Sequence, residues 1–239
     1  MGRGDMMILM GKAPLSGKVK TRMCPPLSHR QAAAFYAATL EDTAEETSSL
    51  RGVRLLLSFA PPASKPYFSS APFSGFSLFE QAGNDLGERM AHAMEEAFAR
   101  GARRAVIIGS DCPALSAGRI RSAFRELLQG ADAVFGPATD GGFYLIGLSA
   151  PARSLFQGME WSATTVLSAI LSRCRNEGMN YALLPAESDV DTAEDLEALR
   201  RWLRARSRPP SPRTRGWLGL KSRPPSSPRG SAFSHRWER

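Results

Sequence analysis

Short apolar segments alternate with longer amphipathic segments along most of this sequence. Continuous apolar runs of strand length lie at 6–11, 53–59, 76–81, 104–111 and 181–186, and 132–148 reads as two apolar strands around a turn. Ala-rich or helically periodic stretches lie at 29–50, 86–101, 163–177 and 192–203, and one more helix follows Ser116. This alternation predicts an α/β fold with a mostly parallel sheet that is covered by helices on both faces.

Two of the predicted helices show clear apolar faces. In 86–101 the apolar face comprises Leu86, Met90, Ala93, Met94, Ala97 and Phe98, and Gly101 is expected to end the helix. In the helix after Ser116 the apolar face comprises Ile120, Phe124, Leu127 and Leu128. We expect these side chains to pack against the sheet.

The basic charge of the chain is concentrated at its C-terminal end. The formal net charge is +8, but 204–239 holds nine arginines and one lysine against one glutamate, which leaves 1–203 with 21 basic and 22 acidic residues. The segment 204–239 is rich in Arg, Pro and Ser and has neither helical nor strand periodicity, so we expect it to be disordered. The sequence therefore predicts one folded domain over 1–203 followed by a disordered basic tail.

Several classes of protein are disfavoured by what the sequence lacks. No run of about 18 apolar residues is present, and the apolar part of the first 14 residues is too short for a signal peptide. Cys24, Cys112 and Cys174 are odd in number and widely spaced, which suits neither a disulfide framework nor a zinc site and favours a reducing cytoplasm. His29, His92 and His235 form no metalloprotease or triad pattern, and Ser110 is not in a nucleophile elbow, so hydrolase chemistry has little support.

A glycine-containing basic loop, "MGKAPLSGKVKTRM", follows the first predicted strand. It is not a P-loop, because five residues separate Gly11 from Gly17 and Lys18 is followed by Val19 rather than by Ser or Thr. Ligands of such sheets bind beyond the carboxyl ends of the strands, where a glycine loop with cations can hold an anion. The alternative is a solvated basic turn.

Acidic residues follow two later strands. Asp111 ends the segment 104–111, at the carboxyl end of its apolar strand, where a carboxylate could hold Mg²⁺ together with substrate phosphates, although it could also cap a helix. Asp189 and Asp191 are two residues apart, so both side chains face the same way in an extended chain. Asp191 or Thr192 could instead cap the last helix, with Thr192 and Asp195 forming a capping box.

Two glycine-containing turns are further candidates. Asp140-Gly141-Gly142 lies between two strands and is explained equally well as a hairpin turn or as a place where backbone meets a ligand. Gly83 and Gly87, with Asp85, precede a helix whose N-terminus favours anions, a weak signal on its own.

In order along the chain, "KAPLSGKVKTRM", "QAGNDLGERMAHA", "VIIGSDCPAL", "GPATDGGFYLIGL", "WSATTVL" and "DVDTAEDL" resemble the bacterial radical-SAM/selenodomain-associated transferase 1 family. That family is glycosyltransferase-like, is linked to arsenosugar biosynthesis and belongs to the nucleotide-diphospho-sugar transferase superfamily. The resemblance covers about residues 6–203 and implies a Rossmann-like three-layer α/β/α sandwich of the GT-A type with a mixed sheet. The opening loop and the single aspartate before a proline also resemble small-molecule guanylyltransferases.

The resemblance also implies roles for individual residues. The nucleotide-binding set would be Lys12, Ala13, Pro14, Gly17, Lys20 and Arg22. Asp111 would bind Mg²⁺ or Mn²⁺, and because the superfamily's usual D-x-D pair is here Ser110-Asp111-Cys112, Asp191 would supply the second carboxylate. Asp140, Gly141 and Gly142 would line the acceptor side, with Asp140, Lys20 and Arg22 as catalytic residues.

These roles predict a metal-dependent transferase that uses a nucleotide-activated donor, with glycosyl transfer from a nucleotide sugar to a small acceptor as the first hypothesis. The second is a nucleotidyltransferase that joins an NTP to a phosphorylated small molecule and releases pyrophosphate. A third is a non-enzymatic protein that binds RNA or an anionic membrane through its basic tail, by steeply salt-dependent contacts. The sequence leaves the oligomeric state open.

Overall fold

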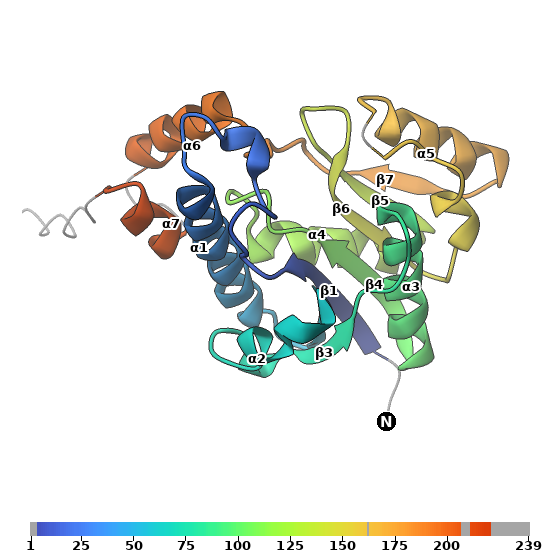
Figure 1. Ribbon diagram of the computed structural model, residues 1–239. Coiled ribbons are helices and arrows are strands. Elements are labelled where there is room, and N and C mark those ends of the chain that lie inside the picture. The colour runs from blue at the N-terminus through green and yellow to red at the C-terminus, as the bar shows by residue number, and fades with distance from the viewer. Residues whose placement is uncertain (1–3, 162, 207–210, 221–239) are drawn as a thin grey trace, which may run out of the picture.

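The computed structural model describes residues 4–161, 163–206 and 211–220. Seven strands form one sheet in the order β3-β2-β1-β4-β6-β5-β7 (Figure 1). In chain order they are β1 (Gly4–Lys12), β2 (Val53–Ala60), β3 (Ser77–Glu80), β4 (Ala102–Ile108), β5 (Ala133–Pro137), β6 (Phe143–Leu148) and β7 (Tyr181–Leu183). Strand β6 runs antiparallel to both β4 and β5, and the other pairings are parallel.

Helices cover both faces of this sheet. They are α1 (His29–Ser48), α2 (Lys65–Phe68), α3 (Leu86–Ala99), α4 (Ala117–Leu128), α5 (Val166–Asn176), α6 (Ala193–Ala205) and α7 (Pro212–Trp217). Short 3₁₀ turns lie at Thr21–Met23, Pro62–Ser64, Phe73–Gly75 and Arg153–Phe156. The α/β class and the mixed, mostly parallel sheet expected from the sequence are confirmed.

The two faces of the sheet bury two separate apolar clusters because strand side chains alternate. Met7 and Leu9 of β1 pack with α1 and α4, whereas Met6 and Ile8 pack with α3 and α5. A third cluster forms beside the sheet around Phe35 of α1 and the apolar side of α6. The helices and the sheet between them are thus three packed layers.

The helix boundaries follow local capping signals. Ser28 caps α1 in a capping box with Gln31, and Ser116 caps α4. Gly101, just past α3, has φ +90°, as expected for a helix-ending glycine. The expected burial of Leu86 and Leu128 is wrong, since they are 48% and 69% exposed. Leu86 is the first residue of α3, and Leu128 is turned about 100° from its buried neighbour Leu127.

The chain beyond 203 differs in part from the expected disordered tail. Helix α6 runs to Ala205, and α7 lies against α1 (Figure 1). Trp217 contacts the ring of Phe35, and Leu218 is buried in the third cluster. Trp217, Leu218 and Leu220 give no helical periodicity in this polar segment, but they pack a short helix against a preformed apolar surface. The remainder of the predicted tail, 207–210 and 221–239, lies outside the described residues.

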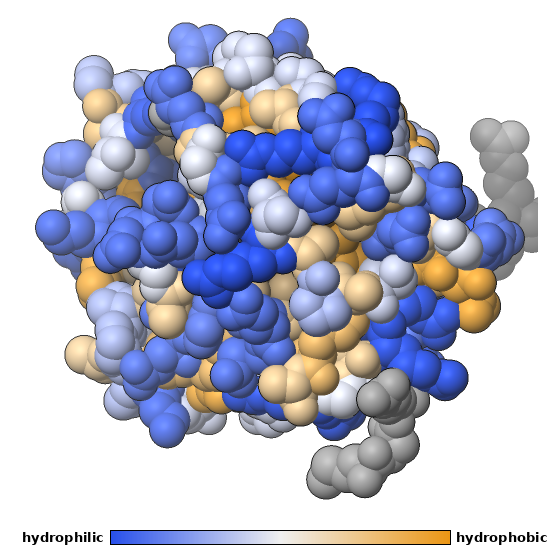
Figure 2. Space-filling view, turned by 90° about the vertical axis from the view of Figure 1, so that its right-hand side faces the viewer, coloured by the Kyte–Doolittle hydropathy of each residue, from blue (hydrophilic) through white to orange (hydrophobic). Residues whose placement is uncertain are grey.

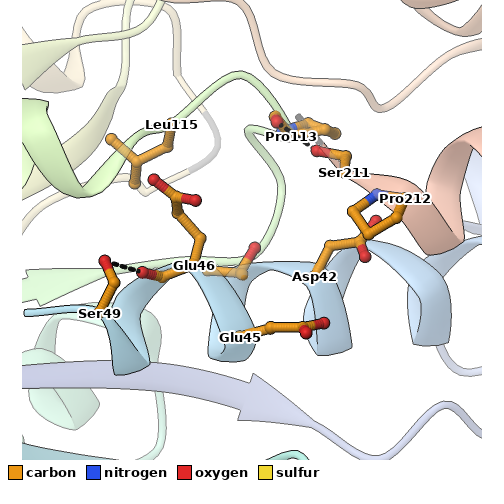
Figure 3. Close-up of a pocket in the computed structure, with 9 residues that line it drawn as sticks. Asp42, Glu45, Glu46, Ser49, Pro113, Leu115, Ser211 and Pro212 are labelled. Atoms are coloured by element: carbon orange, nitrogen blue, oxygen red, sulfur yellow. Dashed lines mark hydrogen bonds between the residues drawn. The ribbon is translucent and has the colours of Figure 1, made fainter. Parts of the chain in front are cut away.

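Polar contacts hold the start of the segment 211–220 against the loop after β4 and against α1. The Ser211 hydroxyl donates to the Pro113 carbonyl, and Figure 3 shows these residues around a small pocket whose floor is the acidic side of α1. Arg213 pairs with the carboxylates of Glu41, Asp42 and Glu45. The charge of this arginine is therefore paired with carboxylates of the same chain.

The outer surface carries no broad apolar area on the side that Figure 2 presents, where hydrophilic residues interrupt the apolar ones. Exposed large apolar side chains of the described residues are scattered: Leu15, Leu86, Leu128 and Leu183. None of the described helices is both long enough and apolar enough to cross a bilayer. Cys24, Cys112 and Cys174 are free thiols.

Candidate active site

The candidate site lies where the chain changes direction across the sheet. Strands β2 and β3 lie on one side of β1 in the sheet, and β4, which follows them in the chain, pairs with the other side of β1. The loops after β1 and β4 therefore leave the same edge of the sheet side by side, and such a switch point is where open α/β sheets bind ligands. The loops after β5 and β7 leave from this edge as well, because β4, β5 and β7 have the same direction.

The loop after β1 is held by backbone contacts at its start. The amide of Lys12 donates to the Tyr36 hydroxyl at 3.0 Å, and the amide of Ala13 donates to the Ala60 carbonyl at 2.7 Å. Gly17 has φ +74° and Lys20 has φ +48°, a left-handed conformation that is uncommon for a side chain other than glycine. The 3₁₀ turn Thr21–Met23 then buries Met23 in the third cluster. Lys20 thus sits between a glycine turn and a buried anchor.

Lys20 joins two of the acidic residues predicted from the sequence. Its Nζ lies 2.5 Å from Oδ1 of Asp111 and 2.6 Å from Oδ1 of Asp191. The Lys20 side chain is 5% exposed, whereas those of Asp111 and Asp191 are 48% and 39% exposed. Burial alone would lower the pKa of Lys20, but the two carboxylates outweigh it and hold that pKa above its usual value. The lysine therefore carries its charge at any physiological pH.

The two aspartates are brought together by a backbone contact between their loops. The amide of Val190 donates to the Asp111 carbonyl at 2.9 Å. Thr192, rather than Asp191, caps α6, and it forms a capping box with Asp195. The carboxylate of Asp191 is therefore available to the site.

Asp189 adds a further acid to this edge. Burial and the carboxylates of Asp111, Asp140 and Asp191 raise its pKa to about 7, and Lys20 opposes them. The Oδ1 of Asp189 is buried and has no hydrogen-bond partner. Four carboxylates thus act on one region that Lys20 alone cannot neutralise.

The Asp140-Gly141-Gly142 turn is locked against the start of α5. The amide of Gly142 donates to Oδ1 of Asp140 at 2.9 Å, and the amide of Leu167 donates to the Gly141 carbonyl at 3.0 Å. Gly141 has φ +94°, and a Cβ there would lie 1.8 Å from the Thr164 carbonyl oxygen. Only glycine fits this position, which explains the paired glycines of the sequence.

The loop before α3 shows helix-capping contacts. Asp85 caps α3 by accepting from the Glu88 amide, and Glu88 accepts from the Asn84 amide. Gly87, expected in the loop before the helix, is instead the second residue of α3, and it packs against Trp161, since a Cβ there would lie 2.4 Å from that ring. This loop therefore has a clear structural role.

The structure brings together the predicted Lys20, Asp111 and Asp191 by direct contact, and it places Asp140 near enough to act on Asp189. Lys12 and Arg22 are exposed on the same loop as Gly17, and Pro14 is half-buried there. Two residues of this site had no role in the expectations from the sequence. Asp189 was noted for its spacing to Asp191 but was given no role, whereas Tyr36 lies in α1, outside every quoted motif, and gave no signal.

Solved structures with this fold indicate the class of the protein. A Desulfovibrio desulfuricans protein, named as a candidate nucleotide-diphospho-sugar transferase, is 32% identical, with 91% of this chain and 94% of that chain covered and a TM-score of 0.84. A cytidylyltransferase from Leptospira borgpetersenii is 14% identical (92% of each chain, TM-score 0.53). A 4-diphosphocytidyl-2C-methyl-D-erythritol synthase from Anaerococcus prevotii is 9% identical (84% of this chain, 96% of that chain, TM-score 0.56).

The last two similarities show a shared fold alone, and together with the first they define a nucleotide-diphospho-sugar transferase-like α/β protein. Within that class, residues 43–163 match the family model described as "Uncharacterized protein conserved in bacteria (DUF2064)". The chain belongs to the DUF2064 family. No curated protein matches it in sequence.

Proposed function

We propose that this protein is a metal-dependent transferase that uses a nucleotide-activated donor, and that it transfers a glycosyl group from a nucleotide sugar to a small acceptor. The observation that carries the proposal is the contact of Lys20 with both Asp111 and Asp191 at the switch point of the sheet. Cation-binding carboxylates and a lysine at this position suit a diphosphate. The 32% identical structure named as a candidate nucleotide-diphospho-sugar transferase supports the same class.

The donor set of the site fits a hard divalent cation. Asp111 and Asp191 offer carboxylate oxygens from two loops, and the buried Oδ1 of Asp189 has no other partner. Among the described residues no three His, Cys, Asp or Glu side chains gather into a complete metal-binding group. Mg²⁺ commonly takes one or two carboxylates and completes its shell with water and substrate phosphates, so two aspartates suffice.

Each predicted side chain has a task in this proposal. Asp111 and Asp191 hold Mg²⁺ or Mn²⁺, which supplies neutralisation of the diphosphate charge when bound. Lys20 and Arg22 stabilise negative charge on the departing nucleoside diphosphate, with Lys12 and the backbone of Ala13, Pro14 and Gly17 along the nucleotide. Asp140 orients the acceptor hydroxyl and accepts its proton, and Gly141 and Gly142 let the acceptor approach the backbone.

Nucleotidyl transfer is the second candidate, because cytidylyltransferases share the fold. In that reaction a phosphorylated acceptor attacks the α-phosphate of an NTP, so the acceptor would bring its own negative charge to the site. Asp140 stands on the expected acceptor side, and its charge acts on Asp189 together with those of Asp111 and Asp191. The carboxylate of Asp140 would repel a phosphorylated acceptor, whereas a neutral hydroxyl compound meets no such repulsion, which keeps glycosyl transfer as the first candidate.

The test has two stages. A thermal-shift screen of nucleotides and nucleotide sugars with Mn²⁺ should find a donor, since a ligand at 100 times its Kd stabilises by about 2.7 kcal/mol. Asp111→Ala should abolish the metal-dependent part of that shift, and Glu197→Gln, an exposed acid of α6, should leave it unchanged.

The product assay then separates the two reactions. Release of a nucleoside diphosphate from a nucleotide sugar supports glycosyl transfer. Release of pyrophosphate that depends on a phosphorylated acceptor would show that the second candidate is correct.

A further inference from the structure

We propose that Lys20 is an internal counterion of the metal site: a divalent cation binds Asp111 and Asp191 only by displacing the ammonium group of Lys20. The displaced ammonium then turns to the donor diphosphate. This inference rests on the proposed function, because it takes Asp111 and Asp191 as the metal ligands. It adds that metal and lysine compete for the same two oxygens.

The contacts place the ammonium where a bridging cation would lie. The ammonium lies 2.5 Å from Oδ1 of Asp111 and 2.6 Å from Oδ1 of Asp191, so it occupies the position between the two carboxylates. A cation held by these carboxylates would share that space with an ammonium of like charge. Because like charges at a few ångströms repel strongly in a partly buried site, a cation that bridges these two Oδ1 atoms and the ammonium do not share the position between them.

Displacement requires only the side chain of Lys20 to move. The backbone is anchored on one side by the Gly17 turn and on the other by the buried Met23. The flexible four-carbon stem can swing from this fixed base. The ammonium therefore stays within reach of the site after it leaves the carboxylates, which places it next to phosphates that the cation holds.

The surplus of negative charge explains why a divalent cation can win this competition. The charge of Asp140 acts on the same region as those of Asp111 and Asp191, and Lys20 brings a single positive charge to oppose them. A divalent cation neutralises more of this charge than a lysine does. The buried oxygen of Asp189, which has no partner, adds to that attraction.

One substitution then has two opposite effects. Lys20→Met removes the competitor, so Mn²⁺ should bind the nucleotide-free protein about tenfold more tightly or better, a change of about 1.4 kcal/mol. The same variant lacks the ammonium that turns to the diphosphate, so it should bind a nucleoside diphosphate more weakly at saturating Mn²⁺. If Lys20 had a purely structural role, Lys20→Met would neither tighten Mn²⁺ binding nor combine tighter Mn²⁺ binding with weaker nucleoside diphosphate binding.

The Mn²⁺ affinity is measured by EPR titration of free Mn²⁺ in the full chain without nucleotide. Lys20→Arg keeps the charge and should bind Mn²⁺ within about twofold of the unmodified chain. Lys18→Met removes an exposed charge from the same loop and should also leave the Mn²⁺ affinity unchanged. Equal or weaker Mn²⁺ binding by Lys20→Met would overturn the inference.

A second measurement needs no variant. Lys20 has a 5% exposed side chain and should react slowly with an amine-acetylating reagent, compared with Lys18. Mn²⁺ alone should accelerate acetylation of Lys20 and leave that of Lys18 unchanged, as read by peptide mass spectrometry. An unchanged or slower reaction of Lys20 with Mn²⁺ would contradict the displacement.

The outcomes also separate this inference from the proposed function. If Asp111→Asn abolishes Mn²⁺ binding while Lys20→Met leaves it unchanged, the metal site stands and the competition is refuted. If the unmodified chain and Lys20→Met both fail to bind Mn²⁺ or any nucleotide, the proposed function and this inference both fall.

Discussion

Thr214 donates two hydrogen bonds to the carboxylate of Asp42, from its backbone N–H at 2.8 Å and from its hydroxyl at 2.7 Å. The residues are 172 positions apart, and both are buried. Hydrogen bonds to an ionised acceptor are stronger than those between neutral groups. Water cannot replace them in a buried position, so the loss of one leaves an unpaired buried polar group. This contact therefore fastens the segment 211–220 to α1.

Replacing Asp42 should release that segment and destabilise the fold. Asp42→Ala leaves both donors of Thr214 and the backbone N–H of Arg213 without an acceptor, at a cost of about 2 to 3 kcal/mol in the free energy of unfolding. Urea denaturation measures this loss. Glu45→Gln is the matched control, since Glu45 pairs with Arg213 but is 57% exposed and should cost less than about 1 kcal/mol. Equal losses in the two variants would mean that the Thr214 contact contributes little.

A second prediction concerns the pH dependence that Asp189 gives to the metal-free protein. The pKa of Asp189 rises from 3.8 to about 7 through burial and three neighbouring carboxylates. The folded state then holds a proton that the unfolded state releases, so this group lowers the stability as pH rises from about 4 to 7. Asp189→Asn should be more stable than the unmodified chain at about pH 8, and the gain should vanish near pH 4.

Thermal unfolding at both pH values, with a chelator present, measures this difference. Asp195→Asn provides a control of opposite sign. Burial would raise the pKa of Asp195, but the Thr192 and Asp191 amides and the Thr192 hydroxyl donate to it and hold its pKa low. Its contribution is therefore present at neutral pH and disappears as pH falls, so the substitution should cost about 1 kcal/mol near pH 7 and less in acid. A stabilising Asp195→Asn, or a destabilising Asp189→Asn, at about pH 8 would contradict these assignments.

Most of the fold could be predicted because its signals are local. Continuous apolar runs such as 104–111 are typical of strands buried on both faces, and Ser28 and Ser116 mark helix starts through their own side chains. The region 61–76 was harder, because its prolines and serines suggest a loop whereas Phe68 and Phe73 are buried. Its packing comes from tertiary contacts with β2 and α1, which local patterns do not reveal.

The meeting of Lys20 with Asp111 could be predicted in outline, because the carboxyl ends of β1 and β4 share one edge of the sheet. The resemblance selected Lys20 and Arg22 over Lys18, but the sequence could not show that Lys20 is the one that turns inward, because this depends on its φ of +48° and on Met23 beneath the next turn. It also could not show Thr214 on Asp42, since that contact joins a polar segment to a distant helix. Asp189 was considered for its spacing, but its raised pKa depends on burial and on charges that include Asp111 and Asp140 from two other loops.

A third prediction tests the turn at Asp140-Gly141-Gly142. Gly141→Ala would place a Cβ 1.8 Å from the Thr164 carbonyl oxygen at φ +94°, so the turn must shift away from the start of α5. We expect a loss of about 2 kcal/mol or more in the free energy of unfolding, together with a raised KM for the acceptor and a smaller change for the donor.

The matched control for this prediction is Gly158→Ala, because Gly158 has φ +57° but no atom within 4 Å of a Cβ. This substitution should cost only the backbone term of about 1 kcal/mol and leave both KM values unchanged. Urea denaturation and steady-state kinetics with each substrate varied in turn measure the difference. A raised KM for the donor alone would mean that the turn lines the nucleotide side, and the acceptor role of Asp140 would then have to be abandoned.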